Sequence, residues 1–180
     1  METQTLSRFD RYMLSNQLRI MEVLIPTEAA DLSTQREIFE NGYEQLYDNG
    51  MQHISPEGET MSSTNCLEVW DTMDMFDGIG RSLSVLSEND NQVSFTKFLG
   101  YDGNSEGHFM AFAEFTVKRL GRFTYLELAE PNCWNSHRST RPIYGRMLSD
   151  WKKLHVKDRF NMSREQLLGV LKAQIHPDNF

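Results

Sequence analysis

The stretch Asn65–Leu86, NCLEVWDTMDMFDGIGRSLSVL, decides the fold class. Its large apolar side chains recur at steps of three and four residues, which places them on one face of an α-helix of about six turns. These residues are Cys66, Val69, Trp70, Met73, Phe76, Leu83 and Leu86. Glu68, Asp71 and Asp74 fall on the other side and favour water. Because an apolar face of this length has to be covered, the stretch predicts the central helix of an all-α domain.

Two details bear on the course of this helix. Gly78 and Gly80 lie two-thirds of the way along it, and they predict either a kink or a close approach by another helix. Asn65 is followed by Glu68, a spacing that predicts an N-terminal cap, because each side chain could bind a free backbone N–H group.

Further helical patterns lie on both sides of the central stretch. A short helix or turn is expected in Val93–Tyr101, and Phe123–Leu128 alternates weakly enough to be extended. The longer helices are expected at Leu6–Ile25, Ala29–Asp48, Asn104–Leu120, Arg141–Leu154 and Ser163–Gln174. The sequence therefore predicts six to seven helices in a single domain over residues 1–180, with a short C-terminal tail at residues 174–180.

The sequence also predicts where several helices begin or end. Leu6–Ile25 carries two adjacent apolar stripes and ends before Pro26. The second helix contains Gly42 and is expected to end at Asn49-Gly50. Ser163 with Gln166 predicts a capping box for the last helix. The two stripes of the first helix are Phe9, Met13, Ile20 and Leu24, and Leu14, Leu18, Met21 and Ile25.

The chemistry-bearing residues form no recognisable motif. The two cysteines, Cys66 and Cys133, lack metal-binding spacing, and no two of the five histidines are four residues apart. A divalent cation bridging carboxylates of the central helix is disfavoured, because a dedicated site takes ligands from more than one element. We therefore predict no cofactor, metal or catalytic residue. Because the apolar runs are short, we expect no membrane span and a soluble cytoplasmic protein.

The charge is distributed very unevenly. The net charge of −8 combines 6 Lys and Arg against 20 Asp and Glu in residues 1–115, 11 against 4 in residues 116–164, and 1 against 2 in residues 165–180. One interpretation is a phosphate- or nucleic-acid-binding surface, or that of an RNA- or nucleotide-handling enzyme, but the overall acidity repels polyanions. The preferred interpretation is that the basic part packs on the acidic part of its own chain or of a neighbouring copy.

Two groups of residues are candidates for sites. The cationic contacts of the basic segment, residues 118–164, would be Arg122, Arg138, Arg141 and Arg146. The loop after the aromatic cluster could hold a site, because loops carry sites more readily than cores do. Its candidates are Tyr101, Asp102, Asn104 and His108. A small-ligand pocket around Tyr101 and Phe112 is a third possibility.

Several short segments occur in an order that resembles the one seen in the YfbU family of bacterial proteins. These segments are RYMLSNQLRIME at 11–22, NGY at 41–43, Cys66, MDMF at 73–76, FLGYD at 98–102, GRFT at 121–124, and RML at 146–148 with Trp151. The resemblance implies a compact multihelical domain that self-associates, and it carries over no catalytic residues. Our leading hypothesis is therefore a homo-oligomeric interaction or regulatory domain whose oligomer, held by charge, loosens in high salt.

Overall fold

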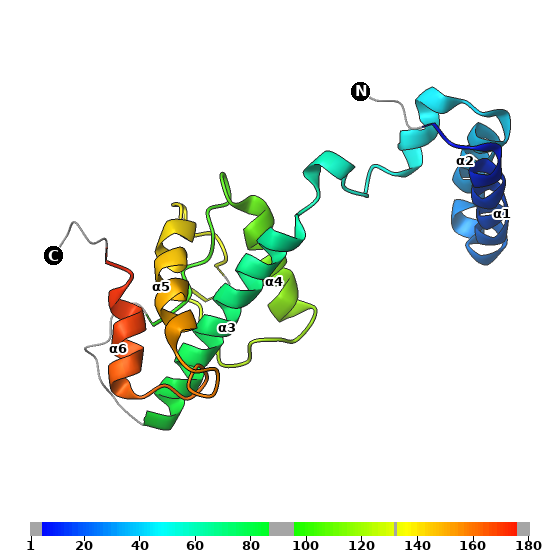
Figure 1. Cartoon of the computed structure of the whole chain (residues 1–180). Helices are drawn as coiled ribbons and strands as arrows, with labels where there is room; N and C mark the ends of the chain where they lie inside the picture. Colours follow the sequence, from blue (N-terminus) through cyan, green and yellow to red (C-terminus); the bar gives the residue numbers. More distant parts are fainter. Residues whose placement is uncertain (1–4, 87–95, 132, 176–180) are drawn as a thin grey trace. The chain divides into compact units, whose positions relative to one another are not determined.

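The computed structural model describes residues 5–86, 96–131 and 133–175. Within these ranges the chain is all-α, with six α-helices, three short 3-10 helices and no named strand (Figure 1). The predicted fold class is confirmed. The chain divides into two compact units, unit 1 at Met1–Thr60 and unit 2 at Met61–Phe180, and each has its own hydrophobic core.

Unit 1 is built on a pair of helices. Ser7 and Asp10 form a capping box at the start of α1, in which the Ser7 Oγ accepts the Asp10 N–H at 3.2 Å and the Asp10 carboxylate accepts the Ser7 N–H at 3.0 Å. The helix ends at Leu24, just before Pro26, as expected. The elements of unit 1 are α1 (Arg8–Leu24), η1 (Pro26–Glu28), α2 (Ala29–Asn41), η2 (Glu44–Gly50) and η3 (Glu57–Glu59).

The end of α2 differs from the sequence prediction. Gly42 has a φ of 72° and follows the last helical residue, and its N–H bonds to the Phe39 carbonyl at 3.3 Å. Glycine takes this left-handed conformation without steric cost, which makes it a common helix stop. The prediction that one helix runs through Gly42 to Asp48 is therefore wrong, since residues 44–50 form the separate 3-10 helix η2.

The core of unit 1 is small. Its buried apolar residues are Leu18, Leu32, Phe39 and Tyr47. The Phe39 and Tyr47 rings stack with their centroids 5.3 Å apart. One of the two predicted apolar stripes of α1, Leu14 to Ile25, packs against this core, whereas the other stripe does not.

Unit 2 is organised around α3. This helix lies between α4 on one side and α5 and α6 on the other (Figure 1). Val69, Met73, Met75 and Ile79 on α3 are completely buried, so the prediction of a central helix is confirmed. The elements of unit 2 are α3 (Ser63–Leu86), α4 (Gly107–Lys118), α5 (Arg141–Lys153) and α6 (Arg164–Lys172).

Gly78 and Gly80 allow loops to approach α3 closely. A Cβ atom added at Gly78 would overlap the Arg159 carbonyl, and one added at Gly80 would overlap the Tyr125 carbonyl. The helix continues through both glycines as one element. The predicted close approach is therefore present, but loop backbone rather than another helix makes it.

The N-terminal cap of α3 is also different from the predicted one. The Ser62 Oγ accepts the Asn65 N–H at 3.2 Å, and α3 begins at Ser63. The Asn65–Glu68 cap is therefore wrong, because Ser62 already stands three residues before Asn65 and the Glu68 carboxylate binds an arginine of α5. By contrast, the Ser163–Gln166 capping box of α6 is confirmed.

The segment before α4 is not helical in its described part, residues 96–101. Phe98 forms an isolated parallel bridge with Leu128, and Tyr101 forms one with Asn135. The short helix or turn expected in Val93–Tyr101 is wrong there, because the backbone of this segment pairs with a distant loop. The extended character expected in Phe123–Leu128 is limited to the bridge at Leu128.

Some expectations remain untested. Residues 87–95, 132 and 176–180 lie outside the described residues, and with them most of the predicted tail at 174–180. The prediction of one domain over residues 1–180 stays a prediction, and each unit is described by itself.

Candidate functional site

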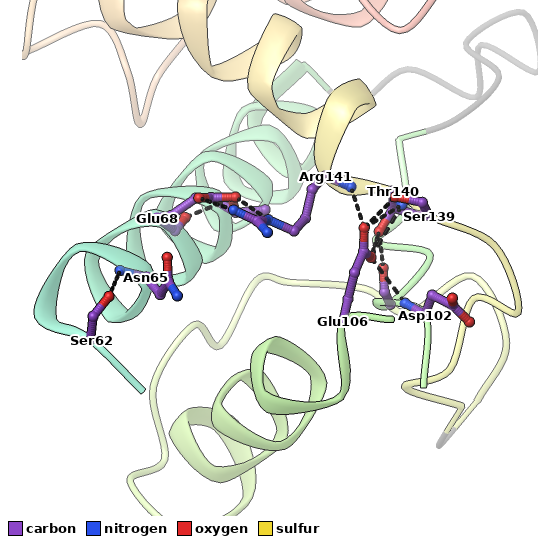
Figure 2. A network of polar contacts seen from close by, with 10 residues as sticks. Ser62, Asn65, Glu68, Asp102, Glu106, Ser139, Thr140 and Arg141 are labelled. Atoms are coloured by element: carbon purple, nitrogen blue, oxygen red, sulfur yellow. Dashed lines mark hydrogen bonds and ion pairs between the residues drawn. The ribbon is translucent and has the colours of Figure 1, made fainter. Parts of the chain in front are cut away.

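A buried carboxylate, Glu106, joins the loop before α4 to the start of α5 (Figure 2). Only 4% of this residue is exposed. Its oxygens accept the backbone N–H groups of Asp102 at 3.0 Å, Thr140 at 3.2 Å and Arg141 at 3.2 Å, and also the Ser139 hydroxyl. We call this arrangement the Glu106 knot.

The Glu106 knot caps α5 from another part of the chain. The first N–H groups of any helix lack partners within the helix, and Thr140 supplies no side-chain cap to α5. A carboxylate at this end also interacts favourably with the helix dipole. Burial by itself would raise the pKa of Glu106, but together the hydrogen bonds from Ser139 and the backbone hold the pKa below its ordinary value. The group is therefore an anion that stabilises the fold.

Arg141 extends this network to α3 (Figure 2). Its guanidinium binds both carboxylate oxygens of Glu68, at 2.7 and 2.8 Å, and lies over the Phe109 ring at 3.9 Å from the centroid. A bidentate pair of this kind fixes orientation as well as distance. Arg141, one of the four predicted anion contacts, thus already holds α3, α4 and α5 together.

The other three predicted cations lie on separate segments. Arg146 on α5 donates to the carbonyls of Pro142, Ala173 and Gln174. Arg122 is exposed after α4 with its guanidinium 6.0 Å from the Trp70 ring centroid. Arg138 is exposed and lines a cleft of about 230 Å³ before α5. An anion site on Arg122, Arg138, Arg141 and Arg146 stays a prediction.

The predicted loop site divides into buried and exposed residues. Tyr101 and Asp102 are buried, whereas Asn104 and His108 are exposed. The Asp102 carboxylate accepts the Ser105 hydroxyl at 2.6 Å and the Ser105 N–H at 3.2 Å, and these bonds lower its pKa. Side-chain bonds of this type shape turns, so Asp102 has a structural role in forming the loop.

The acidic side of α3 is partly neutralised by α5. Glu68 pairs with Arg141 and Asp71 pairs with Lys152. The interpretation that the basic segment packs on the acidic part of its own chain is confirmed for these two pairs. Within the described ranges, no three His, Cys, Asp or Glu residues gather in a way that could hold a metal ion.

Two features were missed by sequence reasoning. Nothing in the pattern around Glu106 indicates that it caps a helix about 35 residues further along the chain. The second feature is the apolar stripe of α1 that stays exposed. The sequence did indicate this exposed stripe, because two adjacent apolar stripes make a face wider than one neighbouring helix can cover.

The comparisons with known proteins agree with the predicted resemblance. The model of the YfbU domain matches residues 4–173. The chain belongs to the YfbU family. The UPF0304 protein MJECS11 of Methanocaldococcus jannaschii is 28% identical over 173 residues, which cover 93% of this chain and 99% of that protein.

The names of the YfbU family and of this relative state no reaction or partner. In the part of the chain that the structure describes, no helix has both the length and the apolar character needed to cross a bilayer.

Proposed function

We propose that this YfbU-family chain is a self-associating interaction protein that binds a second copy of itself through one face of α1. The observation behind the proposal is a row of large apolar side chains that none of the described residues of unit 1 covers. We call this row the α1 stripe, and it consists of Phe9, Tyr12, Met13, Ile20, Val23 and Leu24.

The α1 stripe lies on one side of the helix, with the polar residues Asn16 and Gln17 between its two halves. Successive members are three, one, seven, three and one residues apart, and these steps keep all six within one side of the helix. Each remains exposed, from 53% at Met13 to 77% at Val23. Scattered exposed apolar residues are normal on a protein surface, whereas a contiguous patch of several hundred Å² marks an interaction site.

The size of the α1 stripe suits a dimer. Six side chains of this size expose roughly 100–150 Å² each, or about 600–900 Å² per copy. Two copies together would bury about 1,200–1,800 Å², which lies within the range of specific protein interfaces. The stripe is therefore large enough to support association without a contribution from unit 2.

The spacing of the stripe favours a second copy as the partner. Phe9 and Leu24 lie at equal distances from the midpoint between Asn16 and Gln17, and so do Met13 and Ile20. A two-fold interface requires that residue i contacts residue j and that j contacts i. Two antiparallel α1 helices centred on this midpoint would place Phe9 against Leu24 of the second copy and Met13 against Ile20.

The small hydrophobic core of unit 1 also favours a second copy of the chain as the partner. A pair of helices with four buried apolar residues has little hydrophobic stabilisation of its own. Two such pairs packed along their α1 helices would form a four-helix bundle, a stable arrangement in which each helix pair covers the other.

Light scattering with size-exclusion chromatography tests the proposal on the full chain. The wild-type protein should be a dimer at micromolar concentration. Ile20→Glu should weaken association tenfold or more, because the interface would bury an unpaired carboxylate. Val156→Glu is the matched control, since Val156 is 65% exposed in unit 2 and should leave the dimer unchanged. A monomeric wild-type protein would contradict the proposal.

The salt dependence of the dimer distinguishes an apolar interface from a charged one. Glu68 pairs with Arg141 and Asp71 pairs with Lys152 within one chain. These charges are therefore already used and do not need a second copy. Ions screen exposed charges but do not weaken apolar contacts. We therefore expect the dimer to persist at about 1 M salt, in contrast to the loosening expected from the charge gradient, and dissociation in high salt would restore the charge-based interpretation.

The alternative, nucleic-acid binding by the basic segment, has less support. Arg141 and Arg146 would have to exchange contacts with their own chain for contacts with phosphates. Filter binding to RNA and DNA at low salt, repeated with Arg122→Glu and Arg138→Glu, tests it.

A further inference from the structure

A second surface feature of unit 1 is a cleft of about 350 Å³ between α1 and the end of α2. Three arginines line it, Arg8, Arg11 and Arg19, together with the polar side chains of Tyr12 and Asn16. Pockets for small ligands start at volumes of roughly 300 Å³, so the cleft has room for a small molecule. We call it the arginine cleft.

The arginine cleft is cationic although unit 1 is acidic. Residues 1–60 contain 4 arginines, no lysine and 11 Asp and Glu, a net charge of −7. Three of these four arginines line the same cleft. The positive charge of unit 1 is therefore concentrated at this cleft, although the unit as a whole is acidic.

One carboxylate, Glu40, also lines the cleft, and it pairs with one of the three arginines there, Arg19. Glu40 accepts hydrogen bonds from Ser15 at 2.8 Å, Arg19 at 2.8 Å and Arg36 at 2.9 Å, and these bonds lower its pKa to about 2. Glu22 also pairs with Arg36. Among the residues that the structure describes, no carboxylate pairs with Arg8 or Arg11, so two positive charges remain uncompensated.

Arg11 is held in position by the end of α2. Its Nη1 donates to the Phe39 carbonyl at 3.3 Å, and a Cβ added at Gly42 would lie 2.9 Å from the same nitrogen. The glycine that ends α2 thus also leaves space for this guanidinium. Only one donor of Arg11 is used in this contact, and its other N–H groups remain for a ligand.

We propose that the arginine cleft binds the phosphate group of a small phosphomonoester. Arg8 and Arg11 are three residues apart on one helix, so their guanidinium groups can reach the same anion. The planar guanidinium matches the geometry of phosphate oxygens. A dianionic phosphate supplies the two negative charges that the cleft lacks, which a single carboxylate does not.

Isothermal titration calorimetry of the full chain with AMP and with inorganic phosphate at low salt tests this site. We expect wild-type protein to bind AMP, and Arg8→Gln/Arg11→Gln to weaken binding tenfold or more. The matched control is Arg119→Gln/Lys157→Gln, which removes two exposed cations from unit 2 and should change the affinity less than twofold. If the double variant fails to fold by circular dichroism, Arg8→Gln alone replaces it, because Arg8 is exposed.

The dependence on pH provides a second measurement. A phosphomonoester loses its second proton near pH 6, while both arginines stay charged. The affinity for AMP should therefore rise between pH 5 and about 7.5, and excess acetate should not compete. No binding of AMP, equal affinity in the Arg8→Gln/Arg11→Gln variant, or competition by acetate as strong as by phosphate would overturn the proposal.

Discussion

Glu106 accepts hydrogen bonds from four residues of unit 2, namely Asp102, Ser139, Thr140 and Arg141. Replacing it by glutamine removes the charge and directs an amide group toward N–H donors. We expect Glu106→Gln to lower the free energy of unfolding by about 2–3 kcal/mol, because buried donors lose a charged acceptor. Urea denaturation measures this loss.

The control for Glu106 is a half-exposed glutamate on α4, the helix that begins directly after Glu106. Glu114 pairs with Lys118 one turn away, and both side chains are substantially exposed. Glu114→Gln should cost less than about 0.5 kcal/mol, as is usual for surface pairs. Equal effects of the two substitutions would show that the Glu106 knot contributes nothing beyond a surface charge.

The pKa of Glu106 sets the pH range of its contribution. Because this pKa is below the ordinary value of 4.5 in the folded protein, the carboxylate stabilises the fold above pH 4.5. This contribution is lost as the pH falls through the folded-state pKa. The difference in melting temperature between wild-type protein and Glu106→Gln should therefore narrow between pH 7 and about pH 3, and a constant difference would contradict the role of the ionised group.

At the scale of elements, glycines in two helices should respond oppositely to alanine. Gly80 on α3 faces the Tyr125 carbonyl, whereas Gly145 on α5 has nothing within 4 Å of the position of an added Cβ. Gly80→Ala should destabilise the protein by about 2 kcal/mol or more through overpacking. Gly145→Ala should stabilise it by about 0.5–1 kcal/mol, because alanine favours the helix.

Urea denaturation of both glycine variants at one pH decides this comparison. The two substitutions add the same methyl group to a helix, so propensity alone would stabilise both. Stabilisation by Gly80→Ala would show that the loop at Tyr125 does not contact α3 closely, contrary to the structure.

At the scale of the whole molecule, the two units have separate hydrophobic cores. We expect a fragment of residues 61–180 to fold, because it contains all the described residues of the hydrophobic core built around α3. The fragment should also be monomeric, since it lacks the α1 stripe. Circular dichroism during thermal unfolding and light scattering measure both properties. Failure of the fragment to fold would favour the prediction of one domain over residues 1–180.

The sequence by itself determined the helical class and the position of the central helix. The reason is local: apolar spacing from Val69 to Phe76 defines a helix face whatever covers it. Local capping boxes such as Ser163 with Gln166 were equally readable. The spacing also showed that α1 has a wide apolar face, although not which stripe would remain uncovered.

Only the tertiary structure decided the contacts between distant segments. Glu106 caps a helix 34 residues away, and Phe98 pairs with Leu128 instead of forming a helix. The pairing of Arg141 with Glu68 and the convergence of three arginines on one cleft likewise depend on packing. Such contacts are set by which surfaces meet in space, and a hydrophobic pattern specifies that a face must be covered but not what covers it.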